Sequence, residues 1–268
     1  DDAWKLGFDH IAIATGAGKP TIIRIKNNLI RGIKKASDFL MALQLTGAAK
    51  ENNLANLQIQ LPAVVIGGGL TAIDTATELL AYYPVQVLKV LDKYEKLTKI
   101  MGMENFWKMY GDDEKEIIKT FIEHGKEIRD ELYFAQKENR KFDILSLEKK
   151  WGGVTIAYRK RMIDSPAYRL NHEEIIKGFE EGISFAENLA PVEAVPDQYG
   201  AVEEMIFERQ KKAESDSPSD AVKYVNSGEF ISLKAKCVMI AAGTSPNIIY
   251  EKEYPGTFEM DENKYFFK

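Results

Sequence analysis

The sequence contains very little cysteine and histidine, which removes several kinds of chemistry at once. Among 268 residues there is one cysteine, Cys237, and three histidines, His10, His124 and His172. A single cysteine excludes an internal disulfide framework, a site built from several thiolates and a CxxC redox pair. The histidines lie far apart along the chain, so a histidine-rich metal site is not expected either. We therefore predict no metal site.

The chain also has no excess of positive charge and no long apolar run. Its 36 basic and 41 acidic side chains give a net charge of −5, whereas non-specific nucleic-acid binding needs a basic surface. No apolar stretch approaches the ~18 residues that span a membrane, and no signal-peptide pattern opens the sequence. We expect a soluble, cytoplasmic globular protein that binds neither nucleic acid nor membranes.

The best-defined local pattern is a strand, a glycine turn and a helix over residues 61–82, LPAVVIGGGLTAIDTATELLAY. The segment from Gly67 to Ala72 fits G-x-G-x-x-A. Gly67 allows the tight turn, Gly69 lets a pyrophosphate approach the backbone, and Ala72 allows close packing of helix and strand. Free N–H groups and the helix dipole would bind the phosphates. The alternative is a glycine turn without a ligand.

The residue that reads the ribose normally follows ~20 residues later, at the end of the second strand. Here the next convincing strand is at 154–158, so we interpret residues 83–151 as a helical insertion in the first crossover. That strand ends in Tyr158-Arg159-Lys160-Arg161. Arginine suits a 2′-phosphate, whereas an acid would bind a free 2′-hydroxyl, so the sequence favours NADPH over NADH. A solvated basic turn is the alternative, and Tyr158 suits either the core or a stacking surface.

Other elements follow from apolar patterns and turn signals. Residues 8–20, FDHIAIATGAGKP, predict a buried strand that ends in a loop, and residues 33–45 show helical spacing. Pro84 is expected to kink or restart a helix. Asn171 and Glu174 predict a helix start at about Asn171. In the last third we expect a polar loop at 214–220, a hairpin turn at Ser227-Gly228, and a buried strand that begins at Cys237.

At this point the sequence resembles the pyridine nucleotide–flavin oxidoreductases of the pyridine nucleotide-disulfide oxidoreductase family. Within them it is similar to the group of the glutamate synthase small subunit, dihydropyrimidine dehydrogenase and adrenodoxin reductase. Four segments carry the resemblance: FDHIAIATGAGKP, VVIGGGLTAIDTATE, VTIAYRKR and CVMIAAGTSPN. They look like the first ATG stretch, the nucleotide loop, the 2′-phosphate strand and the second ATG stretch. SPAYRLNHEEIIKGFEEGISF is similar to the family's segment after the basic strand.

The resemblance implies an NADPH-dependent flavoprotein in which the nicotinamide passes hydride to N5 of FAD. Position by position, Gly67, Gly69, Thr71 and Ala72 would meet the pyrophosphate, and Arg159 and Arg161 the adenosine phosphate. Gly16 and Gly243 would lie where the domain-joining strands turn. No catalytic residue is predicted. The predicted cofactor-binding residues are Gly67, Gly68, Gly69, Leu70, Thr71, Ala72, Tyr158, Arg159, Arg161, Ala242 and Gly243.

The departures from the family define the expected organisation. The FAD fingerprint is absent, the sequence begins at Asp1, and Leu70 replaces an often small polar residue. The lone cysteine excludes the thiol–disulfide branch. We expect an α/β, Rossmann-like three-layer domain with a parallel sheet, a β-meander and the helical insertion, cut from a larger oxidoreductase. Residues 1–60 and 246–268 would be connectors to an FAD-binding domain of the same polypeptide, and residues 61–245 the NAD(P)H-binding domain; an electron-accepting domain or subunit is a further possible partner.

Two rival functions stay open at the sequence level. A methyltransferase also binds its cofactor at a glycine loop, but it would need an acid where Arg159 stands. A non-catalytic scaffold could retain the nucleotide fold while the helical insertion mediates assembly.

The insertion's aromatic residues are interpreted as a small core of its own, or else as a docking surface. Cys237 is interpreted as a small core residue, and His172 as a solvent-facing residue near a helix start.

Overall fold

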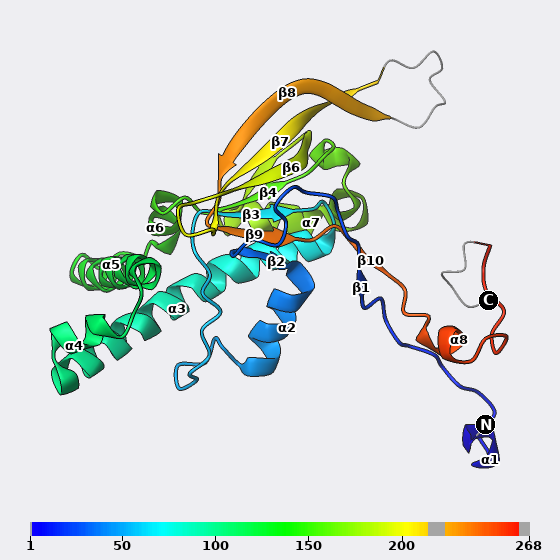
Figure 1. Ribbon diagram of the computed structural model, residues 1–268, viewed down its shortest axis with the longest axis horizontal. Coiled ribbons are helices and arrows are strands. Elements are labelled where there is room, and N and C mark those ends of the chain that lie inside the picture. Colours follow the sequence, from blue (N-terminus) through cyan, green and yellow to red (C-terminus); the bar gives the residue numbers. More distant parts are fainter. Residues whose placement is uncertain (1, 214–222, 263–268) are drawn as a thin grey trace. The chain divides into compact units, whose positions relative to one another are not determined.

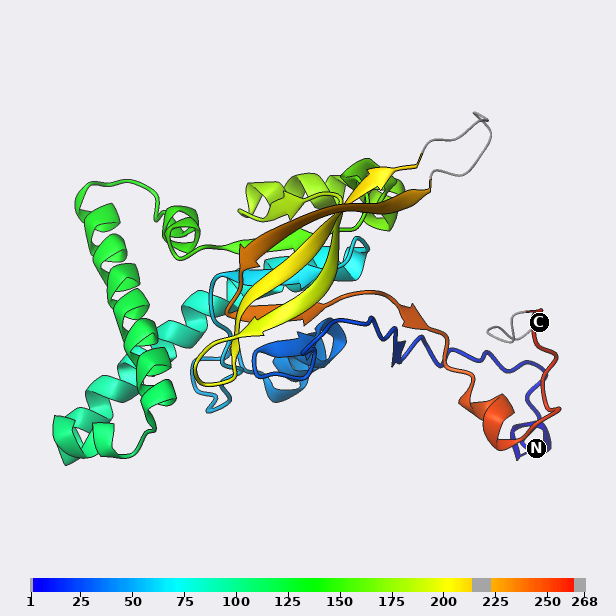
Figure 2. The ribbon, with the colours of Figure 1, turned by 45° about the horizontal axis from the view of Figure 1, so that its top comes forward.

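The computed structural model describes residues 2–213 and 223–262, whose elements form two compact units (Figures 1 and 2). The smaller unit combines the residues up to Ile23 with those from Ala242 onward, and the larger unit is Arg24–Ala241. Residues 24–60, which the sequence analysis assigned to the first connector, thus lie in the larger unit. The predicted polar loop at 214–220 falls outside the described residues.

The smaller unit is built on one short antiparallel pair. Strand β1 (Lys19–Pro20) pairs with β10 (Thr244–Ser245), and the unit also contains the short helices α1 (Asp2–Lys5) and α8 (Ile249–Glu253). The buried strand predicted over residues 8–20 is wrong, because only its last two residues form a strand and Ile11 is 49% exposed. Among the described residues no strand pairs with residues 8–18, and the apolar side chains of Phe8, Ile11 and Ile13 are exposed.

The larger unit contains a parallel sheet with the strand order β2-β9-β3-β4-β5. All four residues of the central strand β3 are buried, as expected for a parallel strand covered on both faces. The predicted helix at 33–45 begins three residues late, because residues 33–35 form the edge strand β2. The strands are β2 (Ile33–Lys35), β3 (Ala63–Ile66), β4 (Val154–Ala157), β5 (Ser184–Ala186) and β9 (Cys237–Ile240).

A three-stranded antiparallel meander lies on one face of this sheet, and helices α2 (Ala36–Thr46) and α3 (Leu70–Met101) lie on the other (Figures 1 and 2). The meander consists of β6 (Leu189–Pro196), β7 (Val202–Lys212) and β8 (Tyr224–Lys234). Helix α7 packs against α3, where Gly178 approaches Ile73 and Ile183. The predicted α/β, Rossmann-like three-layer fold with a parallel sheet and a meander is confirmed.

The hairpin turn predicted at Ser227-Gly228 is wrong. Both residues lie inside β8, where the pairing with β7 shifts from Glu208↔Phe230 to Gln210↔Asn226. Three residues of β8 therefore face one residue of β7, which is a β-bulge. Gly228 has φ +82° and supplies the left-handed conformation that the bulge requires. A Ser-Gly pair suits a bulge as well as a turn, and strand pairing decides between them.

The helical insertion between β3 and β4 is present and leads away from the sheet (Figure 2). Its first helix runs through Pro84 without a restart, contrary to expectation. Tyr83 and Val87 on either side of Pro84 are fully buried, so packing holds the helix together where the proline removes a hydrogen bond. The helices of the crossover are α3 (Leu70–Met101), α4 (Met103–Lys108), α5 (Asp112–Lys137) and α6 (Ile144–Lys150).

The prediction that the insertion's aromatic residues form its own core is confirmed in part. Phe106 and Phe121 are buried, whereas Tyr133 and Phe134 are 60% and 47% exposed. Phe106 contacts the rings of Tyr94, Trp107 and Tyr110. A second cluster links α3 and α5 to the start of β4. There, the ring of His124 stacks on Trp151 at 4.2 Å and its Nδ1 lies 2.6 Å from the Tyr83 hydroxyl. Burial lowers the pKa of His124 to about 4, so this ring is neutral at ordinary pH.

Helix α7 (Pro166–Glu180) begins five residues before the predicted start. Ser165 caps it by accepting a hydrogen bond from the Tyr168 N–H (3.1 Å), and Pro166 occupies the first helical position. Asn171 instead interrupts the helix, with φ −158° and ψ 82°. Its side chain donates to Glu174 (3.3 Å), so the predicted pair exists at an internal kink rather than at the helix start. His172, beside that kink, is exposed.

One buried acid gives the fold a predicted pH dependence. Glu148 on α6 is 4% exposed, and burial raises the pKa of its carboxyl from 4.5 to about 7. At Glu148 the folded state therefore binds more protons than the unfolded state between these values, so the contribution of this carboxyl to stability is largest below about pH 4.5 and is lost as the pH rises to about 7. The lowered pKa of His124 acts in the opposite direction, which is why the effect is read from the difference between variants. Between these pH values the ionisation of Glu148 should lower the free energy of unfolding by about 1–3 kcal/mol, and we expect Glu148→Gln to abolish this decrease.

Urea unfolding at a series of pH values between 4.5 and 8 measures this effect. Glu123→Gln, at an exposed position on α5, is the matched control and should keep the dependence of the unmodified protein. An unchanged pH dependence in Glu148→Gln would show that the buried carboxyl is not its source.

Candidate functional site

The glycine loop between β3 and α3 is shaped by contacts with two other segments. A Cβ on Gly67 would lie 2.3 Å from the carbonyl oxygen of Ala241, and a Cβ on Gly68 would lie 2.4 Å from the ring of Tyr158. These two glycines are therefore required by the protein's own packing. A Cβ on Gly69 would meet no atom within 4 Å. The third glycine thus faces open space, which leaves the backbone at this position accessible to a ligand.

Helix α3 begins without a side-chain cap. Its N-cap residue is Gly69, with extended backbone angles (φ −94°, ψ 175°), and no side chain caps this end. The Ala72 N–H donates to the Gly69 carbonyl (2.9 Å). Among the described residues, none accepts a hydrogen bond from the N–H groups of Gly69, Leu70 or Thr71. Several backbone donors at the positive end of a 32-residue helix are therefore available to an anion.

The other predicted residues of the loop serve the fold. Ala72 is fully buried against the sheet, as its small size predicts. Leu70 is partly buried and packs against the hydrophobic core, which accounts for an apolar residue at a position that is often polar. Thr71 is exposed, and its carbonyl accepts a hydrogen bond from the Thr75 hydroxyl (2.6 Å).

Three strands bring the predicted site segments to one edge of the parallel sheet. Ile66 at the end of β3 lies in register with Ala157 of β4 and Ile240 of β9. The glycine loop, the basic turn and Ala241 therefore all follow the carboxyl ends of adjacent strands. The chain crosses to one side of β3 to form β4 and to the other side to form β9, which makes this edge a topological switch point. Open α/β sheets bind ligands at such points.

Tyr158 joins the glycine loop to the basic turn. It is half-buried, its ring covers Gly68, and burial raises the pKa of its hydroxyl. Its backbone N–H donates to Ala186 (2.9 Å), and its carbonyl accepts from Leu189 (2.9 Å). Tyr158 therefore packs inside the protein, and of the two interpretations left open by the sequence, the structure favours a core contact for this face of its ring.

The two arginines of the basic turn at residues 158–161 differ in their hydrogen-bond partners. Arg159 is exposed and makes no hydrogen bond or ion pair with any described residue. Arg161 instead donates to Asp164 (2.9 Å) and to the Tyr224 hydroxyl (3.2 Å). These hydrogen bonds lower the pKa of Asp164, and the Tyr224 hydroxyl also donates to it (2.6 Å). Arg159 is thus the guanidinium free to bind a phosphate, whereas Arg161 is held by the protein.

Three residues near this turn were not predicted from the sequence. Asp164 and Tyr224 fix Arg161, and Tyr224 reaches the turn from the distant strand β8, a pairing that carries no local sequence signal. Ser165 is buried and caps α7, whose Ala167 N–H donates to the Gly68 carbonyl (3.0 Å). The Ser-Pro pair at 165–166 is an N-terminal helix signal that would have located this residue.

Two of the predicted cofactor-binding residues, Ala242 and Gly243, belong to the smaller unit. There, the Gly243 carbonyl accepts a hydrogen bond from the Thr21 N–H (2.9 Å), and the Gly16 carbonyl accepts one from Asn247 (2.9 Å). The two predicted turn glycines, Gly16 and Gly243, have φ +69° and +90°, the left-handed conformation that favours glycine. Their predicted role toward a nucleotide remains a prediction.

Other kinds of site find no support in the part of the chain that the structure describes. Across residues 2–213 and 223–262, no cluster of three or more His, Cys, Asp or Glu side chains could hold a metal ion. Cys237 is buried at the start of β9, and burial raises the pKa of its thiol to about 11, as suits a core residue. Within these same ranges no helix combines the length and apolar character needed to cross a membrane.

Comparison with known proteins connects this geometry to a fold but to no assigned family. No family model matches the sequence. The chain is 37% identical over 273 residues to the uncharacterized protein RP006 of Rickettsia prowazekii (strain Madrid E), with 99% of the chain aligned to 36% of that protein. The chain therefore spans about a third of the length of this curated relative.

Among solved structures, the chain is similar to the oxidoreductase FprA of Mycobacterium tuberculosis. It aligns to FprA in complex with NADPH with a TM-score of 0.50 at 16% identity, covering 94% of this chain and 52% of FprA. A second FprA structure, which reveals a covalent modification of NADP+, gives the same values. At this identity the likeness establishes the fold, and it agrees with the Rossmann-like architecture described above. The chain is thus a Rossmann-like α/β protein structurally similar to FprA.

Proposed function

We propose that this chain is the NADPH-binding domain of a flavin-dependent oxidoreductase similar to the glutamate synthase small subunit. One observation carries the proposal. The uncapped start of α3 and the free guanidinium of Arg159 follow the neighbouring strands β3 and β4, at the same edge of the sheet. The N–H groups of Leu70 and Thr71 offer donors for a diphosphate, and Gly69 leaves room for it. Arg159 follows the next strand, where the 2′-phosphate of NADPH would distinguish it from NADH.

The two arginines of the turn would act in different ways. Arg159, which has no partner among the described residues, would bind the 2′-phosphate by charge-assisted hydrogen bonds. Arg161 would shape the turn through Asp164 and Tyr224 and add positive potential without leaving its partners. Both arginines were predicted to meet the adenosine phosphate, but with Arg161 held by its partners only Arg159 would contact it directly.

The remaining residues would position the nucleotide rather than react. Tyr158 fills the space beside Gly68 and so fixes the loop before a ligand arrives. The hydrogen bond from Ala167 to Gly68 ties the loop to α7 as well. A loop held in this way loses little conformational entropy on binding. In the whole protein, the bound nicotinamide would supply hydride to FAD held by a separate FAD-binding domain of the same polypeptide.

The preference for NADPH provides the test. Arg159→Ala is expected to weaken NADPH binding by ~1–3 kcal/mol, the range for hydrogen bonds to charged groups, and to leave NADH binding almost unchanged. Isothermal titration calorimetry of the described chain with each nucleotide measures both values. Arg129→Ala, which removes an exposed ion pair with Glu95 on the helical insertion, is the matched control. Equal affinity of the unmodified chain for NADPH and NADH, or no binding of either, would contradict the proposal.

A further inference from the structure

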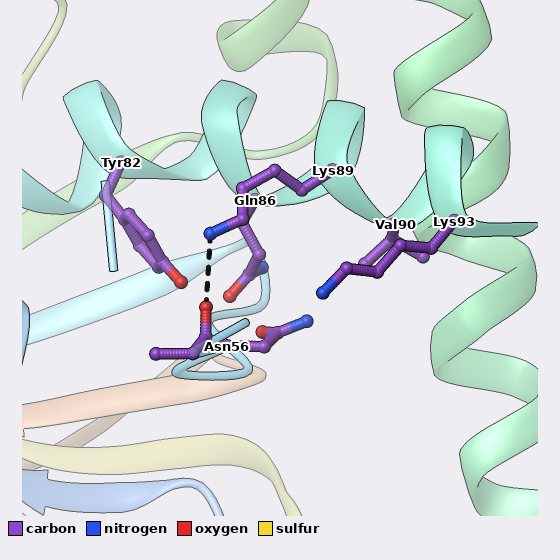
Figure 3. A pocket seen from close by; sticks show the side chains of 7 residues that line it. Asn56, Tyr82, Gln86, Lys89, Val90 and Lys93 are labelled. Carbon is purple, nitrogen blue, oxygen red and sulfur yellow. Dashed lines mark hydrogen bonds between the residues drawn. The ribbon is translucent and has the colours of Figure 1, made fainter. Parts of the chain in front are cut away.

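A small pocket lies between α3 and the loop that precedes β3, away from the sheet edge described above (Figure 3). Its volume is about 30 Å³, and a water molecule needs only ~10–15 Å³ on the same scale, so the pocket has room for one or two water-sized groups. The polar side chains that line it are Asn56, Tyr82, Gln86, Lys89 and Lys93. No carboxylate is among the lining residues.

Lys89 brings a positive charge to this pocket and holds it in a fixed position. Its ammonium group donates to the carbonyls of Ala48 (2.8 Å) and Ala55 (3.3 Å), which lie in the loop before β3. Both partners are neutral dipoles, so the charge itself remains uncompensated. Burial, together with the nearby charge of Lys93, lowers the pKa of Lys89.

Lys93 and Asn56 add further donors. The ammonium group of Lys93 makes no hydrogen bond or ion pair with the described residues, and its end points toward the amide of Asn56 in Figure 3. The amide oxygen of Asn56 accepts a hydrogen bond from the Gln58 N–H (2.8 Å). The NH₂ of Asn56, an exposed residue, is left free to donate, so neither this amide nor the Lys93 ammonium group has an acceptor among the described residues.

The remaining polar groups of the pocket do not supply that acceptor. Gln86 uses its oxygen to accept from the Ile59 N–H (2.9 Å) and its nitrogen to donate to the Ile59 carbonyl (2.8 Å). The Tyr82 hydroxyl accepts from the Leu57 N–H (3.1 Å), which leaves its own proton available for donation. Two ammonium groups, an amide and a hydroxyl thus present hydrogen-bond donors to a space whose side-chain oxygens each already accept a hydrogen bond from the backbone.

We propose that this pocket binds a monovalent anion of halide or carboxylate chemistry between Lys89 and Lys93. A single negative ion would satisfy the free donors of Lys93 and Asn56 and offset the repulsion between the two ammonium groups. The small volume selects against a tetrahedral oxyanion such as phosphate or sulfate. Because Lys89 and Asn56 connect α3 to the loop that leads into β3, the bound anion would hold that loop in place.

Chloride is the probe for the first test, with the linewidth of its ³⁵Cl NMR signal as the readout in the presence of the described chain. The unmodified protein should broaden this signal, and Lys93→Met should weaken chloride binding at least ~tenfold, as expected for losing a hydrogen bond to a charged group. Lys99→Met, on the exposed side of the same helix, is the matched control and should broaden the signal like the unmodified protein. Lys93→Met is chosen because Lys89 also anchors the loop, so its removal would test folding as well.

Competition between acetate and chloride, and the position of bromide in crystals, complete the test. Added acetate should reverse the chloride broadening if the pocket accepts a carboxylate, and no reversal would restrict the ligand to halides. Bromide soaked into crystals should give an anomalous peak within hydrogen-bond distance of Lys89, Lys93 and Asn56. The absence of broadening, equal loss of broadening in Lys93→Met and Lys99→Met, or a bromide peak only elsewhere would overturn the proposal.

Discussion

Gly67→Ala is expected to lower the free energy of unfolding by about 3 kcal/mol, because overpacking against backbone cannot be relieved by a side-chain movement. The added Cβ would lie 2.3 Å from the carbonyl oxygen of Ala241 and 3.0 Å from its carbonyl carbon. Both atoms belong to the segment that follows β9, so the strand itself would have to shift. Urea unfolding followed by circular dichroism measures the loss.

The control for this effect is alanine at Gly200, which lies in the β6–β7 connection with no atom within 4 Å of an added Cβ. Gly200 has φ +74°, so its substitution carries the conformational cost of a positive φ but no clash. A loss for Gly67→Ala that is no larger than for Gly200→Ala would mean that the contact with Ala241 is not as close as the structure shows.

Gly69→Ala is expected to have the opposite profile, with little loss of stability and a loss of nucleotide binding of about 100-fold. The Cβ would enter open space, and the extended backbone of Gly69 suits any residue, so folding should change by less than ~1 kcal/mol. A diphosphate approaching the N–H groups of Leu70 and Thr71 would meet that Cβ. The loss of one or two hydrogen bonds to a charged group, at ~1.5–3 kcal/mol each, accounts for the expected factor.

Calorimetric titration with NADPH, together with urea unfolding of the same variant, separates the two effects. If Gly69→Ala binds NADPH as tightly as the unmodified chain, the phosphates do not lie over this glycine and the proposed site is misplaced. If the variant unfolds as readily as Gly67→Ala, the space beside Gly69 is occupied by the protein itself.

Much of the architecture could be predicted because short stretches of the sequence carry the patterns typical of each strand, turn and helix. The buried run of β3, the three glycines and the helix that follows identify the first Rossmann unit, and all of these elements are present. The second strand was predicted across an insertion of some 70 residues, since β-branched residues end there in a basic turn. Phe121 and Ile128 of α5 are both buried, as their helical spacing of seven residues favours.

The errors occurred where long-range contacts outweigh the local pattern. Residues 8–18 read as a buried strand, but they find no strand to pair with among the described residues. Gly228 reads as a turn, but β7 pairs along both sides of it and turns it into a bulge. The division of roles between Arg159 and Arg161 was also beyond sequence reasoning, because it depends on Tyr224 from the meander.

A crystal structure of the chain with NADP+ would decide whether this sheet edge binds a dinucleotide. Diphosphate oxygens should lie within about 2.7–3.2 Å of the backbone nitrogens of Leu70 and Thr71, and the 2′-phosphate should contact the guanidinium of Arg159. Arg161 should keep its hydrogen bonds to Asp164 and Tyr224 in that complex. Density for the nucleotide elsewhere on the chain, or none at saturating NADP+, would contradict the claim that this sheet edge is a dinucleotide site.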